Sequence, residues 1–519
     1  MVRRLSSVIR HPSSPMCYHA ATMSLTIYNV LKREKELFKP IQEGLVTMYV
    51  CGPTVYDYSH LGHAKTYVSF DVIVKWLRYS GYRVRYVQNI TDVGHLLDDG
   101  EDRILKGARR ERIEPMEVVE RYMREYFTDM DSLGVARPDI SPRASAHVPE
   151  QIEMIKTLIA NNYAYEVNGS VYFSVESFKD YGKLSGRRVE EMEAGKRVAV
   201  RDEKRHPQDF ALWINASDEH ILRWLSPWGW GYPGWHIECS AMSGKYLGET
   251  FDIHGGGVDN IFPHNECEIA QSEAAHGGKT FANIWMLSGT LLIDSVKMSK
   301  SLGNFVSVKD ALTRYKPESL RMFILQGLYR SPADYSEEAL EAASKGYERL
   351  NNAVRRIRDE LKHATGESAN LPGKDNTAEL NANLDQTLDK ARLAFTSAMN
   401  DDFNTPLALG ALFDLSTEVN RWIDKGIATK DMLQQASDIF KDMGGDVLGV
   451  VREGVGSAGG VGSVNEADRV GKLVDMLIAM RLDARKNKDF ARADAIRKQL
   501  ADIGVTLEDG AKGTGYRLN

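Results

Sequence analysis

Residues 45–63 read LVTMYVCGPTVYDYSHLGH, an apolar run followed by a Gly-Pro break and by two histidines around a glycine. Farther along, Phe70, Ile73 and Leu77 fall on one helical face. The stretch predicts a strand, a loop and a helix, and such a loop directs backbone N–H groups and the positive helix end toward a phosphate. His60 and His63 could donate hydrogen bonds to that phosphate, although two surface histidines on a turn would be the commoner explanation of this pattern alone.

A second segment, far along the chain, decides between these interpretations. Residues 297–304 read KMSKSLGN, and Lys297 and Lys300 on a loop of small residues suit a mobile cover for a triphosphate. Alone, this segment could be a solvated basic turn. Together the two segments resemble the HIGH and KMSKS signatures of the class I aminoacyl-tRNA synthetases, with Leu61 in place of the usual isoleucine.

Length and composition limit the class of protein. A chain of 519 residues with 43% hydrophobic residues is long enough for about three domains with sizeable cores. The formal net charge of −6 means that a nucleic acid would have to bind local basic patches. Four scattered cysteines do not suit a secreted disulfide framework and fit a reducing cytoplasm. No apolar run approaches the roughly 20 residues that span a bilayer, so we expect no membrane partner.

The order of strands and helices predicts an α/β fold. Residues 83–90 alternate like a strand, and a right-handed crossover from residues 45–50 would make half of a Rossmann-like, doubly wound parallel sheet. We expect a catalytic domain at residues 23–335, with an inserted connective subdomain at about 125–232. Within it, residues from about 163 to 232 depart from the helical spacing of the residues before them.

Helical spacing dominates the rest of the chain. Residues 336–452 predict an antiparallel helix bundle, in which the acids of residues 401–406 are best explained as part of a helix N-cap. A Gly-rich linker at 453–467 and a small mixed α/β domain at 468–519 follow. The helices of that last domain carry basic residues, and we expect their apolar side to consist of Leu473, Leu477, Met480, Phe490 and Ile496.

The N-terminal extension of residues 1–22 has several arginines and serines and no acid, which is the composition of an organelle transit peptide. Because an ordinary beginning follows at Met23, we favour a start-site artefact or a disordered tail over a targeting signal.

Four residues suggest a metal site. Cys51 and Cys239 lie at the expected ends of strands, and Pro263 can begin a helix that places His264 and Glu268 at i and i+4, on one face. These donors could complete a tetrahedral set. From the residues alone, a buried structural cysteine beside a His–Glu helix pair is the alternative.

The same regions resemble the cysteinyl-tRNA synthetase family. CGPTVY at 51–56, GWHIECS at 234–240 and the helix of His264 carry the resemblance, which extends from Met23 to Asn519. It implies one Zn²⁺ ion per chain, with the substrate thiolate at an additional coordination position. Because zinc prefers a thiolate to a hydroxyl, serine would be rejected at the binding step. The implied zinc ligands are Cys51, Cys239, His264 and Glu268.

The sequence departs from the family pattern next to these ligands. The family often has a second histidine directly after the first, where this chain has Asn265. Cys267, at i+3 from His264, is a conceivable substitute for Glu268 as a ligand.

Further contacts with substrates are expected around the glycine run FDIHGGGVD at 251–259. Backbone without side chains can approach a ligand closely, so Gly257 and Asp259 are expected at the ATP, with Asp259 on a ribose hydroxyl; a plain tight turn is the alternative. We also expect Thr54 and Trp235 to contact the substrate.

The resemblance implies a two-step ligase that activates L-cysteine with ATP and Mg²⁺ and passes it to the terminal adenosine of tRNA(Cys). His60, His63, Lys297 and Lys300 would stabilise phosphate charge, and we expect a cytoplasmic monomer. One rival is the actinobacterial ligase that joins cysteine to an amino sugar, which would not need the basic C-terminal domain. Another is an inactive, zinc-stabilised RNA-binding module, against which the intact histidines and lysines argue.

Overall fold

The computed structural model describes most of the chain, in two compact units, residues Met1–Val451 and Arg452–Asn519, which we treat separately. The N-terminal extension and almost all of the expected Gly-rich linker lie outside the described residues. These are 24–94, 102–187, 203–218, 220–298, 304–363, 377–451, 466–510 and 513–518.

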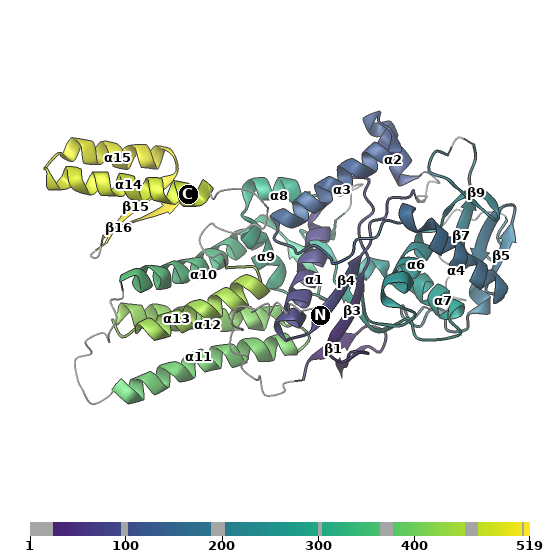
Figure 1. The fold of residues 1–519 in the computed structure, drawn as a ribbon, viewed down its shortest axis with the longest axis horizontal. Helices are drawn as coiled ribbons and strands as arrows, with labels where there is room; N and C mark the ends of the chain where they lie inside the picture. The colour runs from purple at the N-terminus through teal and green to yellow at the C-terminus, as the bar shows by residue number, and fades with distance from the viewer. Residues whose placement is uncertain are drawn as a thin grey trace, which may run out of the picture. The chain divides into compact units, whose positions relative to one another are not determined.

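A four-stranded parallel sheet in the order β11-β10-β3-β4 forms the centre of the first unit (Figure 1). Alternate side chains of β3 enter two different cores: Met48 packs in the core that contains α1, whereas Tyr49 packs with residues of α6 and α7. Helices therefore cover both faces, which confirms the predicted doubly wound α/β fold. The elements are β3 (Leu45–Val50), α1 (Leu61–Tyr79), β4 (Arg83–Gln88), α6 (Trp235–Leu247), β10 (Phe251–Gly257), α7 (Glu266–Ala275) and β11 (Ala282–Ser288).

A five-stranded antiparallel sheet in the order β5-β6-β7-β9-β8 interrupts the chain between β4 and α6. Phe173 and Trp213 are fully buried in its core. The helices before it and its strands are α2 (Arg103–Glu111), α3 (Pro115–Ser132), α4 (Val148–Ala160), β5 (Ala164–Val167), β6 (Ser170–Phe173), β7 (Phe210–Asn215), β8 (Trp224–Ser226) and β9 (Gly229–Pro233).

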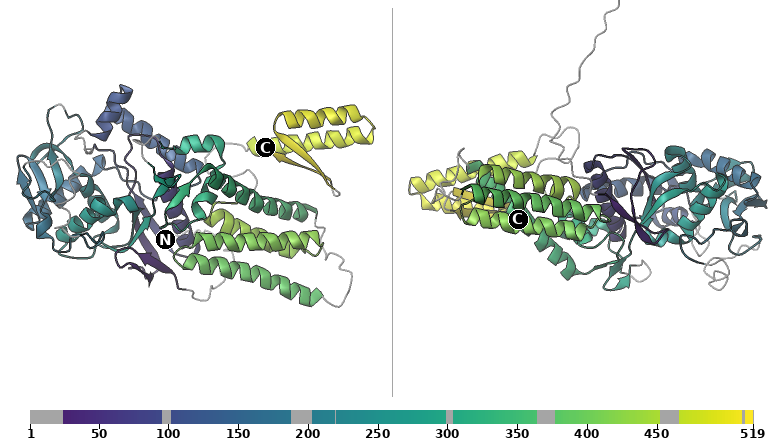
Figure 2. Two further views of the ribbon diagram at one scale, coloured as in Figure 1. Left: turned by 180° about the vertical axis from the view of Figure 1, so that it is seen from behind. Right: turned by 90° about the horizontal axis from the view of Figure 1, so that it is seen from below.

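Long helices follow the sheet and lie side by side in Figures 1 and 2. They are α10 (Glu337–His363), α11 (Thr377–Asn400), α12 (Thr405–Asp424) and α13 (Lys430–Ile439). Phe395, Leu415 and Trp422 fill the space between them. Shorter elements are β1 (Thr26–Asn29), β2 (Glu34–Leu37), β12 (Leu291–Ile293), β13 (Val296–Lys297), α8 (Val308–Arg314), α9 (Pro317–Leu325) and β14 (Ala333–Tyr335).

Asp402 joins the helix bundle to the half of the unit that contains the parallel sheet. Its buried carboxylate accepts hydrogen bonds from Tyr28 N at 2.9 Å, from the Tyr329 hydroxyl at 3.0 Å and from Arg330 Nε at 2.8 Å. The N-cap of α12 is Asn404, whose side chain accepts from the backbone N–H of Leu407. A helix does begin here, but the expectation that the acids cap it is wrong for Asp402.

The second unit packs two helices against a hairpin: α14 (Glu466–Lys486), α15 (Phe490–Asp502), β15 (Val505–Gly510) and β16 (Gly513–Leu518). Its core includes Ile496, as expected. Leu473, Met480 and Phe490 are instead exposed, so the expected apolar side is wrong at these positions. Instead, Val474 and Ile478 form the buried face of α14.

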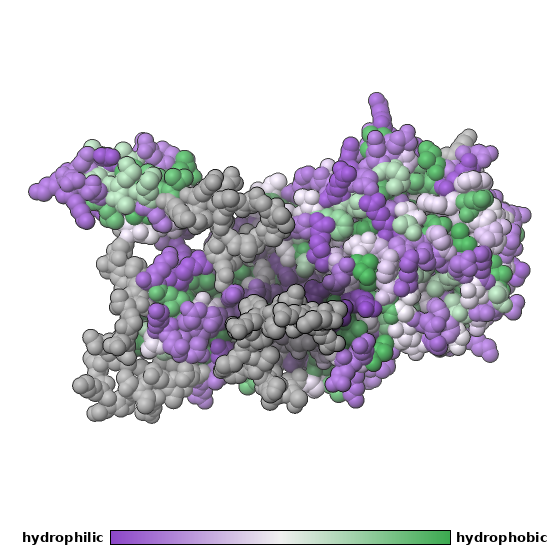
Figure 3. All heavy atoms as spheres, viewed as in Figure 1, coloured by the Kyte–Doolittle hydropathy of each residue, from purple (hydrophilic) through white to green (hydrophobic). Residues whose placement is uncertain are grey.

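The described residues also bear on whether the chain has a membrane-spanning element. On the face drawn in Figure 3, apolar side chains of the described residues are scattered among hydrophilic ones. Within the part of the chain that the structure describes, no helix combines the length and apolar character needed to cross a bilayer.

Replacing Asp402 with alanine should destabilise the first unit. Three hydrogen-bond donors would lose a common buried acceptor, and we expect the free energy of unfolding to fall by about 2–3 kcal/mol, measured as an earlier first transition in urea. The neighbouring Asp401→Ala is the matched control, because Asp401 is half exposed and pairs with Lys35 at the surface. Equal shifts for both variants would contradict the role of Asp402.

Candidate functional site

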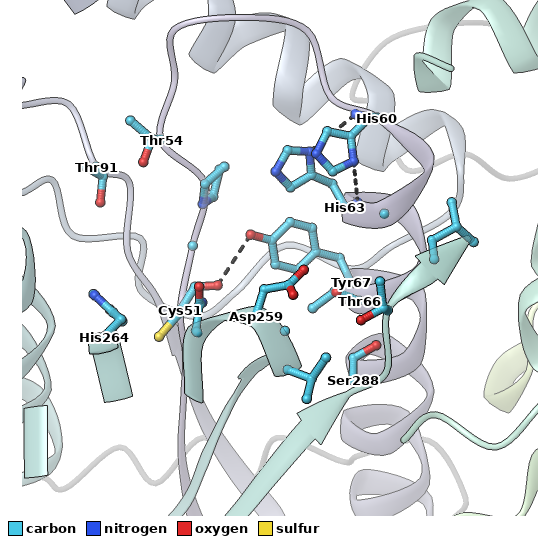
Figure 4. A pocket seen from close by; sticks show the side chains of 18 of the residues that line it. Cys51, Thr54, His60, His63, Thr66, Tyr67, Thr91, Asp259, His264 and Ser288 are labelled. Carbon is cyan, nitrogen blue, oxygen red and sulfur yellow. Dashed lines mark hydrogen bonds between the residues drawn. The ribbon is translucent and has the colours of Figure 1, made fainter. Parts of the chain in front are cut away.

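A cavity of about 530 Å³ lies where the central parallel strands end (Figure 4). Cys51 follows β3, Asn89 follows β4, Gly257 ends β10 and Ser288 ends β11, and all four line it. A crevice at the carboxyl ends of the strands is the expected place for a ligand in an open α/β sheet.

His60 and His63 cap the helix at one end of this cavity. His60 is the N-cap of α1 and its Nδ1 accepts from His63 N at 3.3 Å, while His63 Nδ1 accepts from His60 N at 3.2 Å. The rings stack with centroids 3.9 Å apart. A side chain on Gly62 would place its Cβ 2.8 Å from the His60 ring, so glycine is required for this stack.

The capping bonds also set the hydrogen-bonding character of the two rings. A neutral imidazole that accepts at Nδ1 carries its proton on Nε2. Both histidines can therefore present an Nε2–H donor beside the positive end of α1, a combination that suits an anion such as a phosphate.

A compact group of buried ligand atoms lies at the other end of the cavity. Cys51, Cys239, His264 and Glu268 each offer one atom, and these atoms all lie within 4.8 Å of one another. Cys51 follows β3, as expected. Cys239 lies inside α6, so the expectation that it lies at the end of a strand is wrong. His264 is in the turn Ile261–Asn265 that precedes α7. His264 Nε2 lies 2.9 Å from Glu268 Oε1, as the predicted i, i+4 spacing requires.

Buried polar partners hold the Glu268 carboxylate in place. His254 Nε2 lies 2.6 Å from its Oε2, and Asn265 Nδ2 donates to its Oε1 at 3.0 Å. Burial alone would raise the pKa of Glu268, but the charges of His254 and His264 hold that pKa well below its usual range. Burial likewise opposes protonation of His264, yet the charge of Glu268 raises the pKa of His264 to about 10.

The two thiols differ in their acidity. Burial alone would raise the pKa of Cys239, but hydrogen bonds from Cys51 and His264 lower it. The hydrogen bond with Cys239, together with burial, raises the pKa of Cys51 well above its usual value. Metal ligands bind without their protons, so a divalent cation here would displace the protons of Cys51 and His264. Two sulfurs, an imidazole and a carboxylate fit a transition-metal ion better than Mg²⁺ or Ca²⁺.

Cys267 does not belong to this group. Its Sγ lies 3.3 Å from the Tyr181 hydroxyl, and the described ligand atoms that converge are those of Glu268 and its three partners. The alternative that the sequence left open is therefore not supported by the geometry.

The remaining predicted residues fall into two sets. Thr54, Trp235, Gly257 and Asp259 all line the cavity. The backbone of Lys297 ends β13, whereas its side chain and the whole of Lys300 lie outside the described residues. Met298, between them, lines the cavity.

Several lining residues were missed by the sequence analysis, among them Thr91, Tyr67 and Arg103. Thr91 Oγ1 donates to Glu238 at 2.8 Å, and the Tyr67 hydroxyl donates to the Cys51 carbonyl at 3.3 Å. Thr91 could have been found, since it directly follows the strand expected at residues 83–90, of which β4 pairs with β3. Nothing in the local pattern marked Arg103.

Comparisons with known families cover most of the chain. The family model described as the tRNA synthetases class I (C) catalytic domain matches residues 37–345. The DALR domain matches residues 394–452, and the cysteinyl-tRNA ligase anticodon binding domain matches residues 469–517.

Curated relatives match along their whole length. The chain is 50% identical over 502 residues to the cysteine–tRNA ligase of Chlorobium chlorochromatii, covering 96% of this chain and 100% of the relative. It is 48% identical over 499 residues to a cysteine–tRNA ligase of Thermus thermophilus, again covering 96% of this chain and 100% of the relative.

Solved structures show the same fold at low sequence identity. Mycobacterium tuberculosis methionyl-tRNA synthetase in complex with methionyl-adenylate superposes with a TM-score of 0.55 at 16% identity, covering 78% of this chain and 89% of that one. The Agrobacterium radiobacter K84 agnB2 LeuRS–tRNA–LeuAMS complex gives 0.57 at 12% identity, covering 79% and 85%.

The purified protein should carry about one transition-metal ion per chain, measurable by mass spectrometry of the metal content. Cys239→Ser should lower the affinity for that ion by at least about 10²-fold, because it replaces a thiolate ligand. Cys267→Ala is the matched control and should keep the metal. Metal-free wild-type protein, or equal loss in the two variants, would rule this arrangement out.

Proposed function

The chain belongs to the cysteine–tRNA ligase family of class I aminoacyl-tRNA synthetases, and from this membership we propose how its residues divide the work. The enzyme activates cysteine with ATP to cysteinyl-adenylate and transfers the cysteinyl group to the 3′-terminal adenosine of tRNA(Cys). The observation that carries the residue assignments is one cavity holding both the histidine pair and the thiol-containing group.

We propose that the phosphates of ATP bind at the start of α1. The cysteine carboxylate attacks the α-phosphate in line and pyrophosphate leaves, so no side-chain nucleophile is needed and catalysis rests on positioning and charge stabilisation. The Nε2–H groups of His60 and His63 donate to phosphate oxygens, and Mg²⁺ enters with the ATP. Lys297 and Lys300 meet the charge that develops on the leaving pyrophosphate.

The buried group at the other end is proposed to hold Zn²⁺. A bound zinc ion would offer a Lewis-acidic centre that takes a thiolate in preference to a hydroxyl, which distinguishes cysteine from serine. His254 and Asn265 fix the orientation of Glu268 through its two oxygens. The proposed ligands are Cys51, Cys239, His264 and Glu268.

The cavity wall supplies the proposed contacts for the remaining parts of the substrates. Trp235 packs against the His264 ring with centroids 4.5 Å apart, which places it beside bound cysteine. Thr54 faces Thr91 across a backbone bridge at the same side of the cavity. Gly257 and Asp259 follow β10 and are assigned to the nucleotide, with Asp259 on a ribose hydroxyl.

The C-terminal unit is assigned to tRNA binding. It matches the anticodon binding domain, and the tRNA it would hold is the second substrate of the ligase. We propose the domain boundaries expected from the sequence, with catalysis at 23–335, the bundle at 336–452 and tRNA binding at 468–519. Cys51 and Cys239, close together and free, also suit a reducing compartment such as the cytoplasm.

Cysteine-dependent exchange of pyrophosphate into ATP tests the activation step. Wild-type protein should catalyse the exchange, and His60→Asn and His63→Asn should each lower its kcat by about 10²–10³-fold because a donor to the phosphates is removed. The KM for cysteine should change little, since the thiol binds at the other end of the cavity.

The acceptor distinguishes this function from its rivals. Charging of tRNA(Cys) with labelled cysteine supports the ligase, whereas charging of an amino sugar would support the related sugar ligase. Protein that binds RNA without any exchange activity would be the inactive module.

Removing the C-terminal unit should separate the two half-reactions. A chain that ends at Val451 should keep cysteine-dependent exchange but lose charging efficiency, kcat/KM for tRNA(Cys), by about 10²-fold, because one of two linked binding surfaces is gone. A charging efficiency equal to that of the full chain would disprove the assignment of this unit to tRNA.

A further inference from the structure

Arg103 lines the cavity and has no assigned role. It is the first residue of α2, and its guanidinium carbon lies 5.7 Å from the ring centroid of Tyr56 and 6.0 Å from that of Trp235. The side chain is half-buried, and its Nε is buried without a hydrogen-bond partner. Arg103 forms no ion pair with any residue that the structure describes.

Two acids near Arg103, among the residues that the structure describes, are engaged elsewhere. The Asp102 carboxylate accepts from the backbone N–H groups of Ile104 and Leu105 and so caps α2. Asp57, beside Tyr56, pairs with Arg110 at 3.2 Å. A guanidinium that loses part of its hydration without gaining an anion is unfavourable, so an anionic group of a substrate is the expected partner.

The surroundings of Arg103 favour a nucleic acid as the source of that anion. Four of the nine residues of α2 are basic and only Glu111 is acidic, so a cationic helix begins at the cavity. α2 packs on α3 at the edge of the catalytic half, where it can be reached from outside (Figure 1). Aromatic rings beside an arginine are the usual means of holding a single strand, by base stacking and phosphate contact.

We propose that Arg103 binds the phosphate of the 3′-terminal nucleotide of the tRNA. This inference rests on the proposed function, since the terminal hydroxyl must enter the same cavity to take the cysteinyl group. The ATP phosphates are assigned to His60 and His63, and the basic residues of α2 favour a tRNA phosphate over the cysteine carboxylate as the anion at Arg103. Tyr56 and Trp235 hold the guanidinium in place and supply faces on which the terminal bases can stack.

The test compares the two half-reactions in Arg103→Gln. The ratio of tRNA charging to pyrophosphate exchange should fall about tenfold, since a charge-assisted contact made only with tRNA is lost. In a plot of the logarithm of the tRNA binding constant against the logarithm of the salt concentration, the slope should become less steep by about 0.7. That is the contribution of one single-strand phosphate. Arg103→Lys should restore part of the charging.

A matched control removes the same charge from the same helix. Arg112 is exposed at the C-cap of α2 and does not line the cavity, so Arg112→Gln should leave the ratio of charging to exchange at the wild-type value. A second comparison uses tRNA(Cys) that lacks its terminal adenylate. Wild-type protein should bind it more weakly than intact tRNA, and Arg103→Gln should bind both alike.

Three results would overturn the inference. A wild-type ratio in Arg103→Gln would show that no tRNA contact is lost. If Arg103→Gln and Arg112→Gln lowered the ratio of charging to exchange equally, Arg103 would act only by long-range electrostatic attraction of the tRNA. A raised KM for cysteine in the exchange reaction, with an unchanged ratio, would assign Arg103 to the cysteine carboxylate. Failure of the wild-type protein to charge tRNA at all would instead count against the proposed function.

Discussion

The contacts of one buried carboxylate, Glu268, fix helix α7 against the ends of the adjacent strands β10 and β3 at the site. Its oxygens contact His264 from the preceding turn and His254 from β10, and Cys51 Sγ, at the end of β3, lies 3.6 Å away. A buried anion is tolerated only where it is paired and hydrogen-bonded. The position of α7 against the sheet, and with it the geometry of the four proposed metal ligands, therefore depends on this set of contacts.

The opposite end of the cavity is organised by a different set of hydrogen bonds. His60 and His63 each use one ring nitrogen to complete the start of α1, and this leaves the other nitrogen oriented as a donor. The same bonds thus stabilise the helix terminus and define the proposed phosphate site. The proposed thiol site and the proposed phosphate site lie on one sheet, an arrangement that suits a reaction joining a cysteine carboxylate to a nucleotide.

Buried charges also connect this site to the helix bundle. Arg321 in α9 is almost fully buried and donates to Asp71 of α1 at 2.7 Å and to the Leu448 carbonyl beyond the bundle helices. Asp402 makes the corresponding connection from the loop before α12 to Arg330. Because both connections lose buried partners if the elements separate, the bundle and the catalytic sheet are held in one unit.

The sequence alone determined the features that depend on local spacing. The strand, loop and helix around His60 and the i, i+4 relation of His264 and Glu268 follow from chain geometry. The residues also offered Cys51 and Cys239 as candidates for the same site, and the resemblance favoured this set over a structural cysteine. Only the tertiary structure decided which side chains meet across distant elements. It excluded Cys267, which contacts Tyr181, and it placed Arg103 near the rings of Tyr56 and Trp235. It also placed Asp402 where the helix bundle meets the rest of the unit. The structure also shows that Leu473 and Met480 are exposed, although their helical spacing predicted that they would be buried. Helical periodicity identifies an apolar stripe, but the elements packed against the helix decide which part of that stripe is covered.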